Sequence, residues 1–592
     1  EAGINYYEFK YREADYGPYP KGLMYYLTMM DSWLYDETKP FIHIEAGDTF
    51  DELKKDARNG YFEKLIKEYL LDNNHKSIIS LVPEYGLEKE KEQKEADKLA
   101  EYKSTLTNDE LKELVKKTKE LKEYQDAPSS QEELEKIPML ELSDIKREPA
   151  KDYNDVKSVD GIKIVHHNIF TNKIAYINLS FDTKCVPDEL IPYMGLLGST
   201  LSLMDTKNYT YPELTNEINI NCGGLATGTA LYSDKVDFSK NTIIYEVKSK
   251  ALYEKVPFVL GMMEEIMYNT RFDDYKRLKE IIARIKSRLE ASLMGQGHSI
   301  AMLECCAQFS ESAYYSDILR GYKYYEFIKK LDEEFEQNKT QIVEKLNMLV
   351  GYIFNKDNVI ISLTADDEGY DCFAKALSAK SCNIKDEHFN TAVRSFTPVN
   401  VKTGYTSASQ VQYVARCGNF VKDGYKYTGA LKVLKVIFSY DYLWINVRVK
   451  GGAYGCMSGS SRNGDFYMVS YRDPNLEKTN DIYEGAADYI RNFDVSRRDM
   501  VKFIIGTIGE IDAPLTPSAM GSRSFTHYMC NCTEDMLRKD REEVLDATVE
   551  SIRELAPLIE SAVGQNYFCV VGNQKQINGA ADLFDEIKPL IG

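Results

Sequence analysis

Apolar and polar positions along the chain predict a repeated α+β unit. A short pattern of a polar start, an apolar strand and a turn occurs at 75–83, at 357–364 and at 565–572. Each copy closes a stretch that mixes helical and strand-like spacing, so each predicts the last strand of a domain, and the recurrence indicates duplication. Chance similarity of short buried strands is the alternative. These markers place domain ends near residues 90, 380 and 592.

The first of these domains is too short to be complete. Residues 4–11 alternate as a strand does, and helical spacing follows after Pro18 and Pro20. The apolar positions with this spacing are Leu23, Tyr26, Leu27, Met30 and Leu34. We therefore expect only the end of an α+β domain here.

Beyond Pro149 the patterns predict two larger units. The runs 161–165 and 174–181 read as paired strands around a Thr-Asn-Lys turn, and an apolar helix follows from Pro187 to Met204. Later segments are helical patterns through 251–348, a loop at 390–408, a strand with Val411, Tyr413 and Ala415, and a helix from Thr428.

A stretch dominated by Glu and Lys, from Leu87 to Lys136, separates the first unit from the rest. Thr107-x-x-Glu110 and Ser130-x-x-Glu133 have the spacing of capping boxes that open helices. A narrow apolar stripe follows the first box at Leu111, Leu114, Val115, Thr118 and Leu121. Caps and a stripe favour a solvated helical hairpin over a disordered tether.

The run Arg448-Val-Lys-Gly-Gly-Ala-Tyr-Gly455 carries the candidate chemistry. In an extended strand, Arg448 and Tyr454 would share a face but lie roughly 20 Å apart, so only a bend lets them reach one target. Gly451 and Gly452 can supply that bend. A guanidinium and a phenol that converge suit a peptide carbonyl, or the oxyanion it becomes on hydrolysis. The alternative is a Gly-rich turn between core strands, with a salt-bridged Arg and a buried Tyr hydroxyl.

Composition excludes some classes of function. The 93 acidic against 74 basic side chains give a net charge of −19, which disfavours nucleic acid as a partner. Eleven cysteines without a disulfide-scaffold spacing indicate a reducing compartment, the cytoplasm or an organelle matrix. No apolar run approaches the roughly 18 residues that a membrane helix needs, so no membrane partner is expected.

Several runs resemble, in the same order, landmarks of the presequence-protease branch of the insulinase-like (inverzincin) zinc peptidases, which form subfamily C of peptidase family M16. Besides the Arg448 run they are 8–13 with 20–23, 71–75, 137–140 with 144–145, 221–225, 427–434, 441–447 and 470–474. The resemblance covers nearly the whole chain. It implies an α+β fold of repeated insulinase/LuxS-like α/β domains, with antiparallel sheets flanked by helices, joined by a helical hairpin.

One motif of that family is missing. Its members carry a His-x-x-Glu-His helix, in which two His bind zinc and the Glu acts as general base. None of the seven histidines here has a Glu and a second His at that spacing. The chain starts at Glu1, and by resemblance its first residues match the middle of the second of four domains. We therefore expect the C-terminal part of a longer peptidase, with Zn²⁺ bound by the N-terminal half.

No metal ligands are predicted in this chain. By resemblance, the zinc helix corresponds here to the helix that ends at Met204, and the ligand positions hold Leu196, Ser199 and Thr200. This domain is thus expected to be a degenerate copy.

The other histidines offer weak alternatives. The run His527-x-x-Cys530-x-Cys532 holds three soft ligands without an evident fourth, so an incidental cluster is favoured over a small zinc module. His166, His167 and His298 are expected to be surface or satisfied core residues.

The predicted domains follow from the markers and the resemblance together. They are 1–90, the C-terminal part of a second peptidase-like domain; 91–148, the charged helical hairpin; 149–392, a third, degenerate domain; and 393–592, a fourth domain with the Arg448 and Tyr454 pair.

The resemblance implies the substrate-binding C-terminal half of a zinc metallo-oligopeptidase, a metalloendopeptidase that degrades unfolded peptides in a closed chamber. Arg448 and Tyr454 are the expected catalytic residues, and Gly451 and Gly452 complete the substrate-binding loop. The expected partners are the N-terminal half and unfolded peptides, and this chain alone is expected to be inactive. The alternative is a non-catalytic scaffold or assembly subunit of the same fold.

Overall fold

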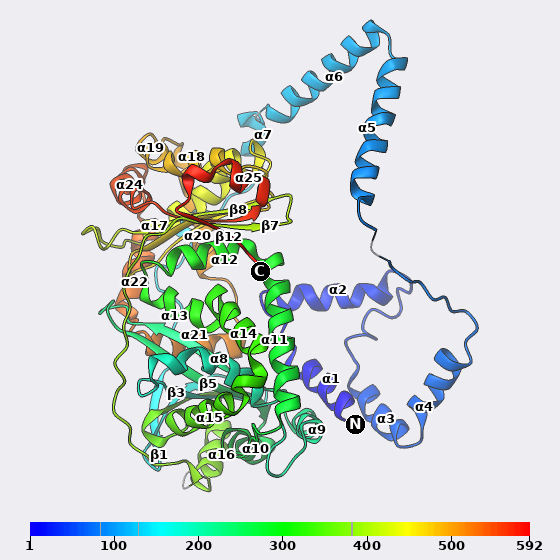
Figure 1. Cartoon of the computed structure of the whole chain (residues 1–592), viewed down its shortest axis with the longest axis vertical. Coiled ribbons are helices and arrows are strands. Elements are labelled where there is room, and N and C mark those ends of the chain that lie inside the picture. Colours follow the sequence, from blue (N-terminus) through cyan, green and yellow to red (C-terminus); the bar gives the residue numbers. More distant parts are fainter. Residues whose placement is uncertain (83, 128, 381–382, 592) are drawn as a thin grey trace. The chain divides into compact units, whose positions relative to one another are not determined.

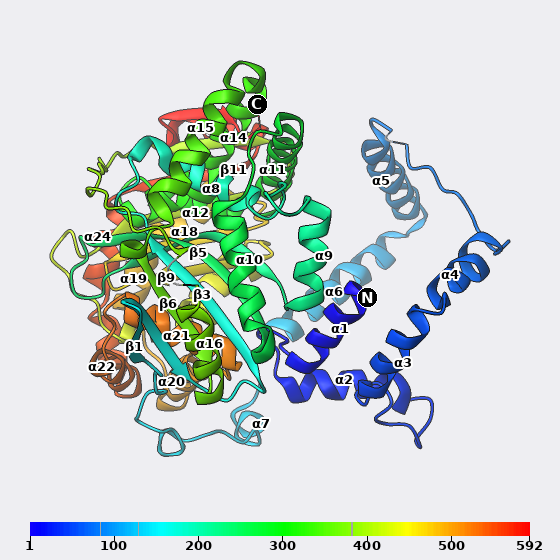
Figure 2. The same ribbon diagram turned by 90° about the horizontal axis from the view of Figure 1, so that it is seen from below.

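The computed structural model describes residues 1–82, 84–127, 129–380 and 383–591. It divides into two compact units: Glu1–Lys54 with Ile145–Gly592, and Lys55–Asp144. The larger unit holds both β-sheets, and the smaller unit is helical (Figures 1 and 2). No helix of the described part combines the length and the apolarity that a bilayer crossing requires.

The first sheet has six strands in the order β1-β2-β6-β3-β5-β4. Its strands are β1 (Asp155–Val159), β2 (Ile162–Asn168), β3 (Ile174–Asp182), β4 (Leu225–Ser233), β5 (Asn241–Leu252) and β6 (Val359–Ala365). All neighbours are antiparallel except β2 and β6. The closing strand predicted at 357–364 is confirmed as β6.

The second sheet repeats this size, in the order β12-β7-β11-β8-β10-β9. Its strands are β7 (Thr403–Ser407), β8 (Gln412–Asn419), β9 (Gly455–Ser460), β10 (Asp465–Tyr471), β11 (Tyr567–Asn573) and β12 (Glu586–Pro589). Here β7 is parallel to both β11 and β12. The predicted α+β fold of repeated units is confirmed, although the sheets are mixed rather than wholly antiparallel.

Helices surround both sheets. Those of the first sheet's domain are α8 (Ile191–Thr200), α9 (Tyr211–Asn221), α10 (Val256–Tyr268), α11 (Tyr275–Gly295), α12 (Gly297–Cys306), α13 (Glu311–Arg320), α14 (Tyr322–Glu333), α15 (Phe335–Ile353) and α16 (Asp367–Ser378). Those of the last domain are α17 (Ala430–Ile437), α18 (Glu477–Glu484), α19 (Ala486–Arg491), α20 (Arg497–Ile511), α21 (Pro517–Met529), α22 (Glu534–Leu545), α23 (Val549–Arg553), α24 (Ala556–Gly564) and α25 (Gln574–Gly579). The chain begins with α1 (Ala2–Glu13), α2 (Lys21–Trp33) and α3 (Gly47–Ala57).

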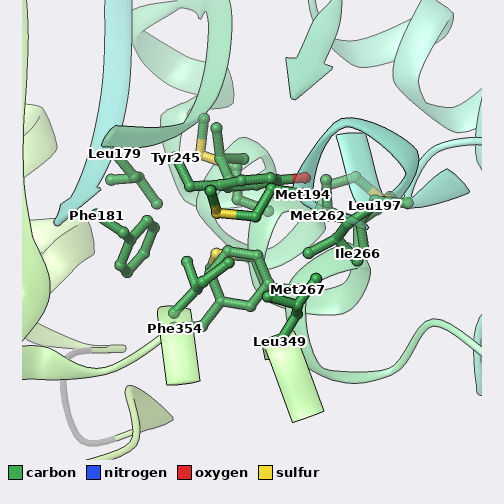
Figure 3. Close-up of a cluster of buried hydrophobic side chains, with 14 of the residues drawn as sticks. Leu179, Phe181, Met194, Leu197, Tyr245, Met262, Ile266, Met267, Leu349 and Phe354 are labelled. Atoms are coloured by element: carbon green, nitrogen blue, oxygen red, sulfur yellow. The ribbon is translucent and has the colours of Figure 1, made fainter. Parts of the chain in front are cut away.

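The core of the first domain lies between its sheet and its own helices. Phe354, which follows α15, packs edge-on against Phe181 of β3 and Tyr245 of β5, at ring distances of 5.1 and 5.6 Å (Figure 3). Burying aromatic side chains of this size contributes about 2 kcal/mol each. Side chains alternate along these strands, so the neighbours of these core residues point to the opposite face.

Each sheet covers its other face with a helix from the other domain. Val165 and Ile244 of the first sheet pack against Phe525 of α21. The second sheet packs in turn against α12, with Tyr413 and Cys417 in that cluster (Figure 1). This exchange joins the two domains into one unit.

The smaller unit contains the predicted helices α5 (Leu87–Thr105) and α6 (Asn108–Asp126), besides α4 (Tyr61–Leu65) and α7 (Gln131–Glu135). Both capping boxes form, because Thr107 accepts from the Glu110 N–H and Ser130 from the Glu133 N–H, each at 3.3 Å. The unit begins at Lys55, ahead of the hairpin predicted from residue 91.

Two strand predictions near the start are wrong. Residues 4–11 lie inside α1, whose Phe9 packs against Gly223. Residues 75–82 form neither strand nor helix, and Pro83, the end of that marker, lies outside the described residues. A strand needs a neighbouring strand for its backbone hydrogen bonds, and residues 75–82 pair with no strand of the described part.

The predicted neighbour of one strand and the predicted last strand of the final domain are also wrong. The strands β2 and β3 are not neighbours, since β6 returns from far along the sequence and lies between them. The last domain does not end with β11, because β12 follows it and pairs with β7, a strand placed where the sequence indicated a loop. Such pairings join residues too distant in sequence for a local pattern to reveal.

Candidate functional site

Arg448 lies at the end of a long helical segment that leads into β9. The segment begins as α17 and continues as two π-helical stretches, Phe438–Tyr442 and Trp444–Val449. Leu443 and Val447, four residues apart, are both buried, as one face of a helix requires. The alternative that places the glycine turn between two strands is therefore wrong.

Both glycines are required by this helix end. The Gly452 N–H donates to the Arg448 carbonyl at 2.8 Å, and the Ala453 N–H donates to the Val447 carbonyl at 3.1 Å. These nested bonds resemble a Schellman cap, widened by one residue as a π-type turn demands. Gly452 has a φ of 82°, and a Cβ on Gly451 would lie 2.4 Å from the Val447 oxygen. The bend thus exists, as a helix cap.

A second loop anchors Tyr454. Its backbone N–H lies 3.1 Å from the Tyr471 carbonyl and 3.3 Å from the Arg472 carbonyl. The Asn475 side chain donates to the Gly451 carbonyl at 2.6 Å. The runs 448–455 and 470–474, which the sequence singled out separately, therefore lie side by side.

Asp473 stabilises that second loop from inside. Its carboxylate accepts from the Thr479 hydroxyl at 2.7 Å and from the Asn475 N–H at 2.9 Å. Its backbone exchanges two hydrogen bonds with Gln412 at the start of β8. Burial raises the pKa of Asp473, and these donors counteract part of that rise.

The Arg448 guanidinium stacks on an aromatic ring instead of pairing with an acid. Its central carbon lies 3.8 Å from the ring centroid of Trp444 and 5.9 Å from that of Tyr454. Tyr454 is 68% exposed. Within the described ranges, no carboxylate forms an ion pair with Arg448 and no group bonds to the Tyr454 hydroxyl. The alternative of a salt-bridged Arg and a buried hydroxyl is not what these residues show.

This arrangement leaves the hydrogen-bond donors of both side chains free. An arginine presents five N–H donors in a planar fork, and a phenol adds an O–H. Stacking on Trp444 orients the fork without using those donors. The pair can therefore bind one oxygen that carries or gains negative charge.

Trp444 is the residue that the sequence analysis missed. It lies four residues before Arg448, a spacing that places two side chains on one helix face. Reading 441–449 as a helix would have revealed the stack. The β-branched and aromatic residues of this run favoured a strand instead.

The helix that the resemblance matches to the zinc helix holds no zinc-ligating side chain at the expected positions. In α8, Leu196 and Thr200 are fully buried, and Ser199 is partly buried. The Thr200 hydroxyl donates to the Leu197 carbonyl at 3.0 Å, within its own helix. These residues do not fit zinc, which takes thiolate, imidazole or carboxylate ligands.

The other candidate ligands do not come together in a buried site. Among the described residues, one group has metal-ligand spacing, and it is the exposed set Asp357, Asp386 and His388. The His527 ring instead bonds to the Asp152 carboxylate at 2.7 Å, and in the described part it forms no metal-like cluster with Cys530 and Cys532.

The buried histidines are satisfied core residues, as expected. His166 lies 3.0 Å from the Ala365 carbonyl, and His167 lies 3.0 Å from the Ser362 hydroxyl. Burial lowers the pKa of His167 to about 4, so this ring is neutral near pH 7. His298 does not follow this expectation, because it is partly buried, packs edge-on against Tyr471 at 4.9 Å, and has an Nδ1 atom without a hydrogen-bond partner among the described residues.

Two family models match this sequence. The model of the region associated with peptidase family M16, subfamily C, matches residues 81–331, and the PreP C-terminal domain model matches residues 404–573. The second match contains Arg448, Tyr454 and all of the loop around them.

The chain is similar to longer proteins over nearly its whole length. It is 39% identical to Protein HypA of Clostridium perfringens, over 100% of this chain and 60% of that protein. It is 30% identical to Presequence protease 1, chloroplastic/mitochondrial, of Arabidopsis thaliana, over 98% of this chain and 54% of that protein. It therefore spans little more than half the length of these relatives.

A solved structure shares the fold. A conserved protein from Enterococcus faecalis V583 superposes with a TM-score of 0.53 over 72% of this chain and 99% of that one. The sequence identity is 12%, so this likeness concerns the fold alone.

Proposed function

The chain belongs to subfamily C of peptidase family M16, and from this premise we propose that it is the substrate-binding C-terminal half of a zinc metallo-oligopeptidase that cuts unstructured peptides. The observation that carries the proposal is the Arg448 guanidinium, stacked on Trp444 beside the exposed Tyr454 and paired with no acid of the described part. A purely structural arginine has no reason to leave its donors free.

Arg448 and Tyr454 act on the carbonyl oxygen of the peptide bond that is cut. Hydrolysis converts this neutral oxygen into an oxyanion, so a cation and a hydroxyl bind it more strongly in the transition state than in the substrate. One such donor typically lowers the barrier by about 3 kcal/mol. The capped loop at Gly451 and Gly452 holds the two donors at one end of β9.

Another part of the protein supplies the metal. Helix α8 offers no zinc ligand at the expected positions, and the three candidate ligands around His388 are all exposed, with the His388 ring bonded to Asp357. Zinc bound elsewhere supplies the activated water. The residues of this chain bind and orient the peptide.

The apolar segment at 78–82 lacks a packed neighbour among the described residues of the smaller unit. Ile78 is 97% exposed and Leu81 is 96% exposed, yet the same pattern forms the buried strands β6 and β11. An apolar segment without a neighbour exposes both its side chains and its backbone donors. We assign its neighbours to the N-terminal half of the protein, which is also the partner that carries zinc.

Replacing Tyr454 with Phe tests the proposal. In the complete protein, Tyr454→Phe removes one hydroxyl donor and is expected to lower kcat/KM for an unstructured peptide at least tenfold, with zinc content unchanged. A quenched fluorescent peptide reports the rate, and elemental analysis reports the zinc.

Tyr440→Phe is the matched control, because Tyr440 is equally exposed at 67% and lies earlier on the same helical segment. Equal rates for Tyr454→Phe and Tyr440→Phe would remove Tyr454 from the site.

The metal assignment has its own test. The 592-residue chain purified by itself is expected to hold far less than one zinc per molecule, whereas the complete protein is expected to hold about one, the stoichiometry of a catalytic zinc site. Elemental analysis after dialysis against zinc measures both. A full equivalent of zinc in the isolated chain would contradict the assignment.

A further inference from the structure

We propose that the outer edge of β9 is a second part of the substrate site, where an extended peptide adds as a strand and places a carboxylate on Arg320. This inference rests on the proposed function, because it extends the peptide away from the bond held by Arg448 and Tyr454. Nothing in the family matches assigns a role to this edge.

The edge strand begins at the candidate site. Tyr454 directly precedes Gly455, the first residue of β9, and β9 is the last strand of its sheet. Among the described strands it pairs only with β10. A peptide that leaves the Arg448 and Tyr454 pair therefore meets an open strand at once.

The register shows which backbone groups are free. The Ser461 N–H donates to the Asp465 carbonyl at 2.9 Å, so this pair bonds across β9 and β10. Because bonded pairs alternate in antiparallel sheets, the backbone groups of Cys456, Ser458 and Ser460 point away from β10. In the described ranges no residue bonds to them from outside.

A pocket of about 510 Å³ lies along this edge. Its wall includes Ser458 and Ser460, together with Cys306 of α12 and Leu431 of α17. The helix α12 packs on one face of the second sheet, whereas α17 lies on the opposite face with α18 (Figure 1). A single pocket can touch helices on both faces only by passing around the strand edge.

Ser458 indicates that this pocket takes a polar ligand. The residue is only 4% exposed, and its hydroxyl has no hydrogen-bond partner in the described part of the chain. A buried hydroxyl without a partner costs about 1 to 3 kcal/mol. A peptide backbone in the pocket offers donors and acceptors to satisfy it.

The charges around the pocket favour a carboxylate on the ligand. Lys432 is paired with Asp540 at 3.1 Å, and Lys435 is paired with Glu510 at 2.8 Å. Arg320, exposed at the end of α13, forms no ion pair or hydrogen bond within the described residues.

The carboxylate in the pocket wall, Asp465, already has hydrogen-bond partners. Asp465 accepts hydrogen bonds from Ser310, Asn419 and Asn463. Arg320 is therefore the cation left for a ligand, and a guanidinium binds carboxylates in a bidentate way.

Strand addition at this edge would bind extended peptides of many sequences. Main-chain hydrogen bonds to β9 supply affinity for any extended peptide, and a carboxylate on Arg320 supplies selectivity. The strand spans about 20 Å from Tyr454 to Ser460, which corresponds to about six residues of peptide. Short peptides that end before Arg320 are therefore expected to bind more weakly.

The test measures binding of a labelled, unstructured peptide of about fourteen residues to the complete protein with its metal chelated. Two versions carry N-methyl groups on alternate residues, in the two possible registers. Strand addition predicts that N-methyl groups in one register weaken peptide binding at least tenfold, because they replace the N–H groups that face β9. N-methyl groups in the other register are expected to change the affinity less than twofold. Equal affinities overturn the proposal.

The protein variants identify the edge. Ser460→Pro removes one outward N–H without a bond to β10, whereas Ser460→Ala keeps it. The ratio of the affinities of the two N-methylated peptides is expected to shrink at least threefold in Ser460→Pro and to persist in Ser460→Ala. Full discrimination in Ser460→Pro places the added strand elsewhere and overturns the proposal.

The carboxylate is tested separately. Arg320→Ala is expected to weaken binding about fivefold or more, and Arg284→Ala, an exposed arginine of α11 outside the pocket, is the control. A C-terminal amide and a Glu→Gln peptide show whether the carboxylate is terminal or on a side chain. Unchanged affinity in Arg320→Ala overturns this contact.

These outcomes are separable from the proposed function. If Tyr454→Phe slows cleavage but the registers bind alike, the edge proposal fails and the function stands. If Tyr454→Phe and Arg448→Ala both cleave at the wild-type rate, the proposed role of this pair fails whatever the peptide registers show.

Discussion

Replacing Arg448 with Ala in the complete protein is expected to lower kcat/KM for peptide cleavage about 100-fold. The change removes a charged donor that meets the oxyanion, and a donor of this kind contributes about 3 kcal/mol to transition-state binding. The loss is expected mainly in kcat, since the interaction strengthens as the carbonyl oxygen gains charge. Initial rates over a range of peptide concentrations separate kcat from KM.

Arg448→Lys refines this experiment. It retains the charge but not the fork or the planar face that stacks on Trp444, so its rate is expected to lie between those of wild type and Arg448→Ala. Arg538→Ala, on the surface of α22 and paired with Glu534, is the control. Wild-type rates in Arg448→Ala would remove Arg448 from the site, whereas a complete protein that cleaves no peptide would favour the alternative of a non-catalytic scaffold.

Glu304→Gln is expected to make the protein more stable than wild type at pH 9, by a few kcal/mol, and to change little at pH 4. Burial, followed by the neighbouring Asp317, raises the pKa of Glu304 to about 8. One of its carboxyl oxygens is buried without a hydrogen-bond partner among the described residues. The side chain lies on α12, the helix that joins the first domain to the second sheet.

The direction in which stability changes with pH follows from the folded and unfolded pKa values of Glu304. The ordinary value of 4.5 applies to the unfolded chain, and the folded value is about 8. Between these limits the folded protein holds a proton that the unfolded chain has released, so stability falls as the pH rises and levels off above about 8. Glutamine is neutral throughout, which removes this loss.

Charged groups on three other elements face the same position. Asp317 of α13 adds a like charge, whereas Lys323 of α14 and Lys588 of β12 favour the ionised form and lower the pKa. Tyr405 of β7 lies in the same cluster, where burial raises its pKa. The net rise shows that burial and Asp317 outweigh the two lysines.

Urea unfolding midpoints between pH 4 and pH 9 measure the effect. Glu344→Gln, an exposed change of the same kind on α15, is the control and is expected to follow wild type. If the urea midpoints of wild type and Glu304→Gln changed with pH in parallel, Glu304 would ionise in the folded protein as it does in the unfolded chain.

Local features were predicted well because they depend on neighbours within a few residues. The capping boxes at Thr107 and Ser130 formed as expected, and so did the strands at 359–365 and 567–573. The family resemblance was confirmed by the matches over 81–331 and 404–573. Both kinds of prediction rest on residues close together in the chain.

Segments with two compatible periodicities were predicted poorly. The run 441–449 is rich in β-branched and aromatic residues, yet it is helical and places Trp444 under Arg448. Residues 4–11 became helical because α9 offers a packing surface for α1. In both cases the surrounding structure outweighed local propensity.

By itself, the sequence determined the repeated α+β units, the hairpin caps and the family, since spacing and residue type express these directly, and it predicted the Arg448 and Tyr454 pair as the site. Only the tertiary structure decided that β6 lies between β2 and β3, that α12 and α21 cross between the domains, and that β9 is an open edge beside the site. Strand order and helix exchange depend on hydrogen bonds and burial between residues hundreds of positions apart, which no local periodicity encodes.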